Sequence, residues 1–207
     1  KGISPDEFPL IPKVDKETSL KITASNLAEA IDSTVFSASI TPTRPILAGV
    51  YMKVEGDTVT TVATDSFRLA EKKTKLLEKV EKDIECIVPV RTMLELGKIL
   101  GNNFEKEPVE VNISKNQILF TLGGIELISR LIEGKFPDYD KIIPRATRTK
   151  IDADVGSLAL AARRVCLFAR ENSNSVKLIA TNDGFLHIAS EETSVGEEKA
   201  EVDITMQ

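Results

Sequence analysis

Few side chains in this 207-residue sequence could carry out bond chemistry, and they are scattered along the chain. A hydrolase could be imagined with Asp65 and Ser66 beside His187, but a triad is recognised by geometry and nothing in this spacing supports one. His187 alternates with Leu186 and Ile188, which indicates a strand whose histidine face is solvated. The paired acidic residues are interpreted as surface charges. We therefore predict a protein without catalytic residues.

Metal and cofactor sites are not predicted either. The two cysteines, Cys86 and Cys166, are isolated, and with one histidine in the sequence they do not form a zinc-ligand pattern. Both are interpreted as buried thiols. The Gly123-Gly124 pair lacks the Gly-Lys-Ser/Thr sequence of a phosphate loop and is predicted to be a hairpin turn. We expect no cofactor and no metal.

Composition indicates a globular chain of one or two domains, with 42% hydrophobic and 29% charged residues. No apolar run is long enough for a membrane span and no signal peptide is recognisable, so we expect a cytoplasmic location without membrane contact. The net charge of −5 lacks the basic balance of many nucleic-acid-binding proteins. The sequence starts without Met and ends in an apolar-alternating run, which we interpret as a fragment of a longer protein.

The elements that would position these residues are best patterned between residues 44 and 73. Three strands are predicted there, 46–54, 58–63 and 67–75, with a tight turn at residues 55–57. Helices with a single apolar stripe, which lie on a sheet, are predicted at 26–38, 90–101 and 154–170, the first with Ser25 as its N-cap. Further strands are predicted at 84–88, 108–114, 117–122, 125–132 and 201–206, and a second hairpin turn is predicted at 182–184.

An internal repeat organises these elements. Phe-Pro and Ile-Pro pairs at residues 8–12 return at 136–144, and Lys-Ile-x-Ala at 21–24 returns at 150–153, each followed by the same order of elements. This predicts three parts: 1–15 as the tail of one unit, 16–145 as a whole unit, and 146–207 as the first half of another. The architecture is α+β, with repeated units of antiparallel sheet that carry two helices on one face.

Two motifs resemble those of a known family. TVATDSFRLA at 61–70 and GKFPDYDKIIP at 134–144 are similar to segments of bacterial sliding clamps, the β subunit of DNA polymerase III, and the resemblance runs from Lys1 to Gln207. It implies the DNA-clamp fold and a non-catalytic processivity factor. Such a protein encircles duplex DNA without sequence preference, binds the polymerase and clamp loader through short hydrophobic peptides, and forms a head-to-tail homodimer. The alternatives are a β-rich ligand-binding module and a hydrolase using Asp65 or His187.

The resemblance also implies site residues. A peptide-binding groove would contain Leu47, Thr64, Ser66, Phe67, Arg68, Leu69, Pro137, Lys141 and Ile142, with Phe67 and Lys141 departing from the usual family residues. Basic helix faces would meet DNA through Arg91, Lys98, Arg163, Arg164 and Arg170, although solvated helix faces would look the same in sequence. Leu167 and Phe168 would contact the next subunit.

Overall fold

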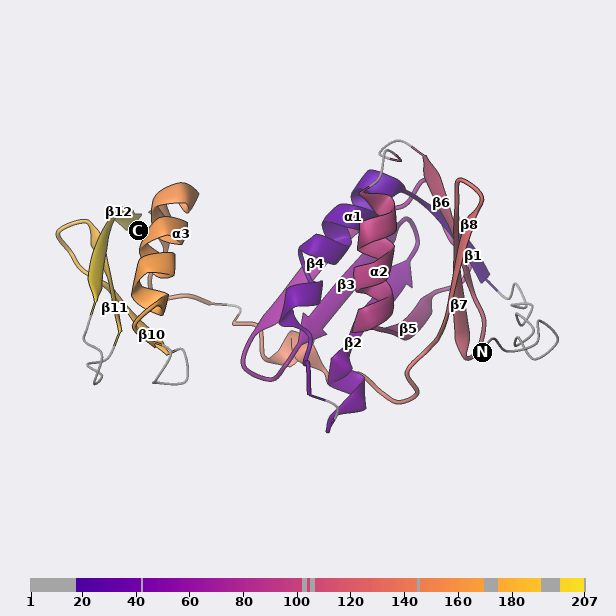
Figure 1. The fold of residues 1–207 in the computed structure, drawn as a ribbon, viewed down its shortest axis with the longest axis horizontal. Coiled ribbons are helices and arrows are strands. Elements are labelled where there is room, and N and C mark those ends of the chain that lie inside the picture. Colours follow the sequence, from indigo (N-terminus) through magenta and orange to yellow (C-terminus); the bar gives the residue numbers. More distant parts are fainter. Residues whose placement is uncertain are drawn as a thin grey trace, which may run out of the picture. The chain divides into compact units, whose positions relative to one another are not determined.

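The computed structural model describes residues 18–41, 43–101, 104, 107–144, 146–169, 175–190 and 198–206. The chain divides into two compact units, Lys1–Pro137 and Asp138–Gln207 (Figure 1). Residues 1–15, predicted to be the tail of a preceding unit, lie outside the described residues.

One sheet of the first unit is an antiparallel meander with the order β4-β3-β2-β5. Its strands are β2 (Gly49–Glu55), β3 (Thr58–Thr64), β4 (Leu69–Lys75) and β5 (Ile84–Pro89). The turn predicted at residues 55–57 is confirmed, with Gly56 in the left-handed region at φ +58°. The predicted strand 46–54 is wrong at its start, because Pro45–Ala48 forms a short 3-10 helix, η3, with proline in its first turn.

The second antiparallel sheet has the order β1-β6-β7-β8. Its strands are β1 (Thr18–Thr23), β6 (Pro108–Ile113), β7 (Gln117–Leu122) and β8 (Ile125–Arg130). Gly123-Gly124 is the two-residue β7–β8 turn, as predicted. Two backbone bonds join the sheets: Leu77 N–H donates to the Lys21 carbonyl and Ile132 N–H donates to the Ile87 carbonyl, each at 2.9 Å. Side chains from both sheets share one hydrophobic core.

Helices α1 (Ala24–Asp32) and α2 (Val90–Leu100) lie side by side against this core (Figure 1). Each helix buries a single stripe, which includes Leu27 and Ile31 on α1 and Met93 and Leu96 on α2. The predicted one-sided packing of both helices is confirmed. Their opposite faces are left exposed.

Helix α1 differs from the predicted helix 26–38 at both ends. Its N-cap is Thr23 and not Ser25, since the Thr23 backbone is extended and its hydroxyl accepts a backbone N–H three residues further on, at 3.3 Å. Strand β1 runs directly into the helix, so the last strand residue is the cap. The helix ends at Asp32, and the remainder of the predicted span contains a separate 3-10 turn, η2 (Val35–Ser37).

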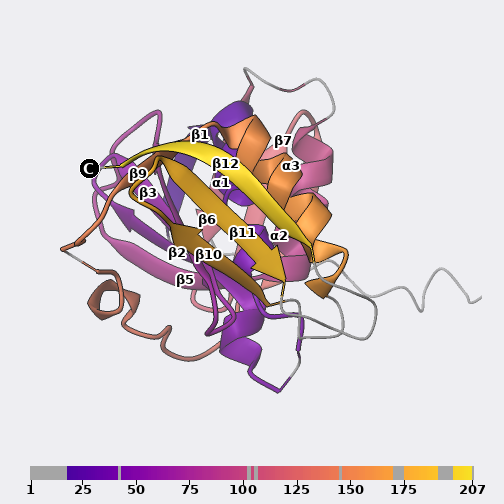
Figure 2. The ribbon, with the colours of Figure 1, turned by 90° about the vertical axis from the view of Figure 1, so that its left-hand side faces the viewer.

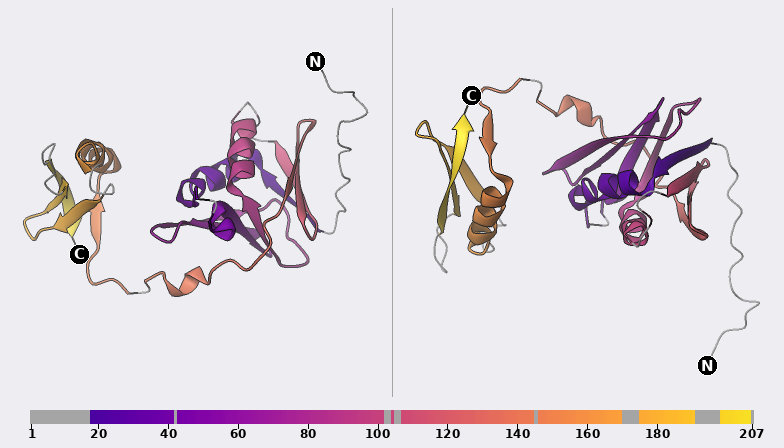
Figure 3. Two further views of the ribbon diagram at one scale, coloured as in Figure 1. Left: turned by 60° about the horizontal axis from the view of Figure 1, so that its bottom comes forward. Right: turned by 90° about the horizontal axis from the view of Figure 1, so that it is seen from above.

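The second unit is a four-stranded antiparallel sheet with helix α3 (Val155–Cys166) on one face (Figures 2 and 3). The strands, in the order β10-β11-β12-β9, are β9 (Ile151–Ala153), β10 (Val176–Ala180), β11 (Phe185–Ser190) and β12 (Lys199–Met206). The turn predicted at 182–184 separates β10 from β11. The core of the unit consists of Ala161, Val165, Leu186, Ile188, Ala200 and Val202.

The two units repeat one order of elements, a strand, a helix and a three-stranded meander. In both, the strand before the helix contacts the last strand of the meander or the residues directly after it. In the first unit the Lys21 carbonyl of β1 accepts a hydrogen bond from the N–H of Leu77, just after β4. In the second unit β9 pairs with β12, with Ala153 opposite Ile204. This shared order agrees with the internal repeat in the sequence. The division into 1–15, 16–145 and 146–207 stays a prediction.

Cys166 corrects one expectation. Of the two cysteines predicted to be buried, Cys86 is buried and Cys166 is exposed in the last turn of α3. Val165, one position earlier, faces the core, so its neighbour is turned outward. Burial raises the pKa of the Cys86 thiol to about 12.

Candidate partner-binding pocket

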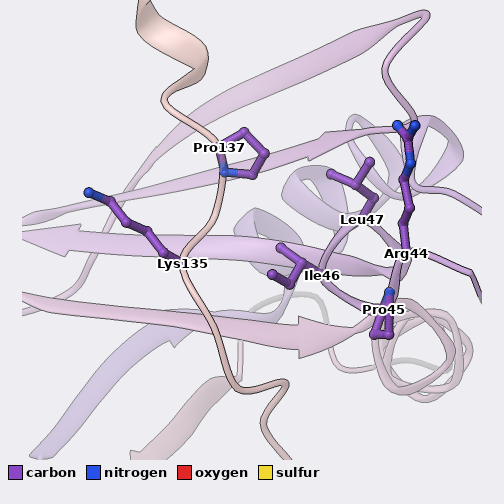
Figure 4. Close-up of a pocket in the computed structure, with 6 residues that line it drawn as sticks. All are labelled: Arg44, Pro45, Ile46, Leu47, Lys135 and Pro137. Carbon is purple, nitrogen blue, oxygen red and sulfur yellow. The ribbon is translucent and has the colours of Figure 1, made fainter.

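A pocket of about 280 Å³ opens in the first unit between η3 and the segment that follows β8 (Figure 4). Its lining consists of Arg44, Pro45, Ile46, Leu47, Lys135 and Pro137. In the view of Figure 4, the Ile46 and Leu47 side chains lie between Arg44 and the segment that carries Lys135 and Pro137. The walls are therefore mainly apolar, with the Arg44 side chain along one side, while Lys135 belongs to the lining although its side chain points away from Ile46 and Leu47 in this view. This mixture suits an apolar peptide side chain with a polar flank.

An aromatic stack holds one wall of the pocket. Phe136 is 7% exposed and stacks on Tyr51 of β2, with ring centroids 4.9 Å apart and ring planes 11° from parallel. Burial and a hydrogen bond with Glu85 raise the pKa of the Tyr51 phenol. Because Phe136 lies between Lys135 and Pro137 in the chain, the stack positions both lining residues.

The opposite wall is held by backbone hydrogen bonds around Leu47. Its N–H donates to the Arg44 carbonyl at 3.0 Å, and its carbonyl accepts the Ser39 N–H at 2.8 Å. Leu47 is only 7% exposed, so it forms the floor of the pocket as well as part of the surrounding core.

The turn between β3 and β4 is fixed by its own side chains. The Asp65 carboxylate accepts the N–H groups of Phe67 and Arg68, each at 3.0 Å, and the Thr64 hydroxyl donates to the Arg68 carbonyl at 2.7 Å. Desolvation opposes ionisation, but these bonds and the Arg68 guanidinium lower the pKa of Asp65. Since the turn occupies residues up to 68, β4 begins at Leu69, two residues later than predicted.

Ser66 connects this turn to the pocket. Its φ of +80° lies in the left-handed region, and its Oγ accepts a hydrogen bond from Nη1 of Arg44 at 3.0 Å. The Ser66 N–H donates to the Thr64 hydroxyl at 3.1 Å. The motif that carries the family resemblance is thus in direct contact with a lining residue.

The nine residues predicted for the groove occupy different positions. Leu47 and Pro137 line the pocket, and Ser66 contacts it through Arg44. The others in the first unit lie outside the lining, at the end of β3, in the turn or at the start of β4: Thr64, Phe67, Arg68 and Leu69. Phe67 is 98% exposed.

Two predicted groove residues, Lys141 and Ile142, belong to the second unit. Lys141 is paired with Asp138, which raises the pKa of its ammonium group, and Ile142 is 67% exposed. Sequence reasoning missed the lining residues Arg44, Pro45, Ile46 and Lys135. The Arg-Pro pair before Leu47 was the available signal, since proline disfavours a continuous inner strand there.

Four of the five basic residues predicted for the helix faces are described, and all four are exposed: Arg91, Lys98, Arg163 and Arg164. Lys98 pairs with Glu95 at 2.9 Å, and Arg164 with Glu198 at 2.5 Å. Within the described part of the chain, Arg91 and Arg163 have no acidic partner. Arg170 lies outside the described residues.

The two predicted subunit-contact residues follow helix α3. Leu167 is its C-cap and is 62% exposed, while Phe168 is half-buried. Leu160, about two helical turns earlier in α3, is also 62% exposed. An apolar strip on the outer side of α3 is consistent with the predicted contact, which stays a prediction.

The candidate catalytic residues are held in structural contacts. His187 pairs through Nδ1 with Glu201 at 3.3 Å, on the face opposite the buried Leu186 and Ile188, and Asp65 anchors its turn. Among the described residues, no three His, Cys, Asp or Glu side chains come together as metal ligands. No helix in the described ranges is long and apolar enough to cross a membrane.

Comparisons with known proteins agree with this fold. The family model of the DNA polymerase III beta subunit, central domain, matches residues 21–138. The beta sliding clamp of Staphylococcus aureus strain Mu50 is 35% identical over 202 residues, which cover 98% of this chain and 53% of that protein. The beta sliding clamp of Staphylococcus epidermidis is 33% identical over 201 residues, or 97% of this chain and 52% of that protein.

Solved structures give the same result for the fold. The sliding clamp of Bacillus subtilis superposes with a TM-score of 0.91 at 32% identity, over 99% of this chain and 54% of that one. The beta subunit of Pseudomonas aeruginosa also has a TM-score of 0.91, at 27% identity, over 99% of this chain and 56% of that one. The predicted α+β clamp fold is confirmed. The chain spans about half the length of the curated relatives it matches.

Proposed function

Because the chain belongs to the family of DNA polymerase III beta subunits, we propose that it is part of a sliding clamp that holds a replicative polymerase on duplex DNA. The observation that carries this proposal is the central-domain match over residues 21–138, joined to a second unit with the same order of elements. Repeated units of one shape are the parts from which a closed ring can be built.

The proposed mechanism is encirclement. An acidic chain with net charge −5 has little general attraction for DNA, so a ring does not depend on a tight grip. Exposed cations on the helix faces, chiefly Arg91 and Arg163, would contact phosphates, and phosphate contacts carry no sequence information. Lys98 and Arg164 would contribute less, because each is already paired with a carboxylate.

The pocket beside η3 is proposed to bind short peptides of the polymerase and the clamp loader. Ile46 and Leu47 supply an apolar floor, and the alkyl stem of Arg44 extends it while its charge stays in water. The nine groove residues predicted from the sequence remain a prediction, and two of them, Lys141 and Ile142, belong to the second unit.

The remaining elements of the proposal concern assembly. The chain would perform no catalysis itself, and it would act as the processivity subunit of a DNA polymerase. The three predicted parts, 1–15, 16–145 and 146–207, would be consecutive pieces of a three-domain clamp. Leu167 and Phe168 would meet the first domain of a second subunit in a head-to-tail homodimer, a heterologous contact that must close into a ring.

Peptide titration tests the pocket. Fluorescently labelled QLSLF-type peptides would be titrated against the wild-type chain, Leu47→Ala and Ile142→Asp, with Leu94→Ala on α2 as a matched exposed-leucine control. We expect each pocket variant to weaken binding about tenfold, as for a central contact residue, and the control to bind normally. Equal binding by all four proteins would show that the peptide site lies elsewhere. Thermal melts would confirm that Leu47→Ala is folded.

A further inference from the structure

Ser66 has a backbone conformation that serine rarely adopts. Among the described residues it is the one non-glycine residue with positive φ, at +80°. Glycine would form the same turn without strain. The geometry of the turn therefore gives no reason for a serine, and strained residues of this kind gather at functional sites. What serine adds over glycine is its hydroxyl group.

That hydroxyl has a specific partner at the pocket. It accepts a hydrogen bond from Nη1 of Arg44 at 3.0 Å, and both residues are held by further bonds. The Ser66 N–H donates to the Thr64 hydroxyl at 3.1 Å, while the Arg44 carbonyl accepts the Leu47 N–H at 3.0 Å. The Arg44 guanidinium is thus fixed at one side of the pocket, beside Leu47 (Figure 4).

Arg44 retains most of its capacity to bind an anion. A guanidinium has five N–H donors in a planar fork that matches a carboxylate, and within the described part of the chain Ser66 engages one of them. The neighbouring acid, Asp65, is already bonded to Arg68 and to the turn backbone. None of the six lining residues is acidic, and Lys135 adds a second positive charge.

We propose that Ser66 is a positioning residue, which presents Arg44 to a carboxylate so that the pocket selects peptides with an acidic residue beside their apolar anchor. This inference rests on the proposed peptide-binding role of the pocket and adds the charge of its preferred ligand. Holding a flexible arginine in place before binding removes part of the entropy cost of the new ion pair. The strained backbone at Ser66 is therefore explained by the selectivity that its hydroxyl group provides.

The test compares the labelled peptides QLDLF and QLNLF, which differ in charge but hardly in shape, by fluorescence anisotropy at low salt. We expect the wild-type chain to bind the Asp peptide about tenfold more tightly, a ratio typical of a charge-assisted contact. Ser66→Gly should cut this ratio to about threefold, because the hydrogen bond that positions Arg44 is lost. Arg44→Met should abolish the preference.

Stability gives a second readout. Ser66→Gly should raise the melting temperature by a few degrees through relief of strain, whereas a residue with a merely structural role would lower stability and weaken both peptides together. Arg130→Met, which removes a charge from β8 outside the pocket, is the matched control and should keep the tenfold ratio. Equal binding of both peptides to wild type, or an unchanged ratio of their affinities in Ser66→Gly, would overturn the proposed role of Ser66 but not the peptide-binding role of the pocket. Binding of neither peptide would overturn the pocket as well.

Discussion

Replacement of Phe136 tests how the pocket wall is held. Phe136 is 7% exposed and stacks on Tyr51 at a centroid distance of 4.9 Å. Phe136→Ala removes a buried aromatic side chain and should destabilise the first unit by about 3 kcal/mol, at the lower end for such truncations because the site lies on an outer sheet face. Phe136→Leu keeps most of the apolar area and loses only the stacking geometry, so about 1 kcal/mol is expected.

A double-mutant cycle with Tyr51→Leu and Phe136→Leu isolates the stacking energy. The coupling should be about 1 kcal/mol, the usual value of an aromatic pair beyond its buried area. Urea unfolding followed by NMR signals of β2 reports the first unit by itself. Phe136→Ala should also weaken peptide binding, since it frees Lys135 and Pro137. Zero coupling, together with unchanged peptide affinity, would refute the idea that this stack positions the wall.

Three further predictions concern packing, pH and charge. Gly49→Ala should cost roughly 2 kcal/mol in urea denaturation, because its Cβ would lie 2.9 Å from Cδ1 of Ile132 in a filled space. Hydrogen bonds from Ser157 lower the pKa of Asp154 below its ordinary value of 3.8, so the ionised Asp154 cap stabilises α3 above that pH. Thermal melts should show that this stability is lost as the pH falls through the lowered pKa. Asp154→Asn should flatten the dependence of the melting temperature on pH. Arg91→Gln should reduce the slope of log K for DNA against log salt by about 0.9.

Local patterns were sufficient to predict most of the fold. The β2–β3 hairpin is specified by a glycine that must adopt positive φ, and the buried stripe of α2 follows from the spacing of Met93 and Leu96. The limits of elements were harder to predict. Helix α1 ends at Asp32, although the apolar spacing continues beyond it, because the chain there changes to a 3-10 turn.

The pocket could be predicted only in part, because tertiary contacts bring together lining residues that are far apart in the sequence. Leu47 was predicted from the family resemblance, but Lys135 lies almost ninety positions away and reaches the pocket because Phe136 stacks on Tyr51. The periodicity of apolar residues indicates which face of an element is buried, but it does not indicate which distant segment packs against that element. The hydrogen bond between Arg44 and Ser66 likewise depends on a turn conformation that serine rarely adopts.

Retention on DNA of different topology tests the proposed encirclement most directly. The full-length clamp containing this chain would be loaded onto nicked circular plasmid, washed at high salt and then treated with a restriction enzyme that linearises the plasmid. A topological link predicts that the protein stays on the circle, because salt screens phosphate contacts but does not open a ring, and that it is released after linearisation. Retention that is equal on linear and circular DNA, or that is lost from the circle at high salt, would contradict it.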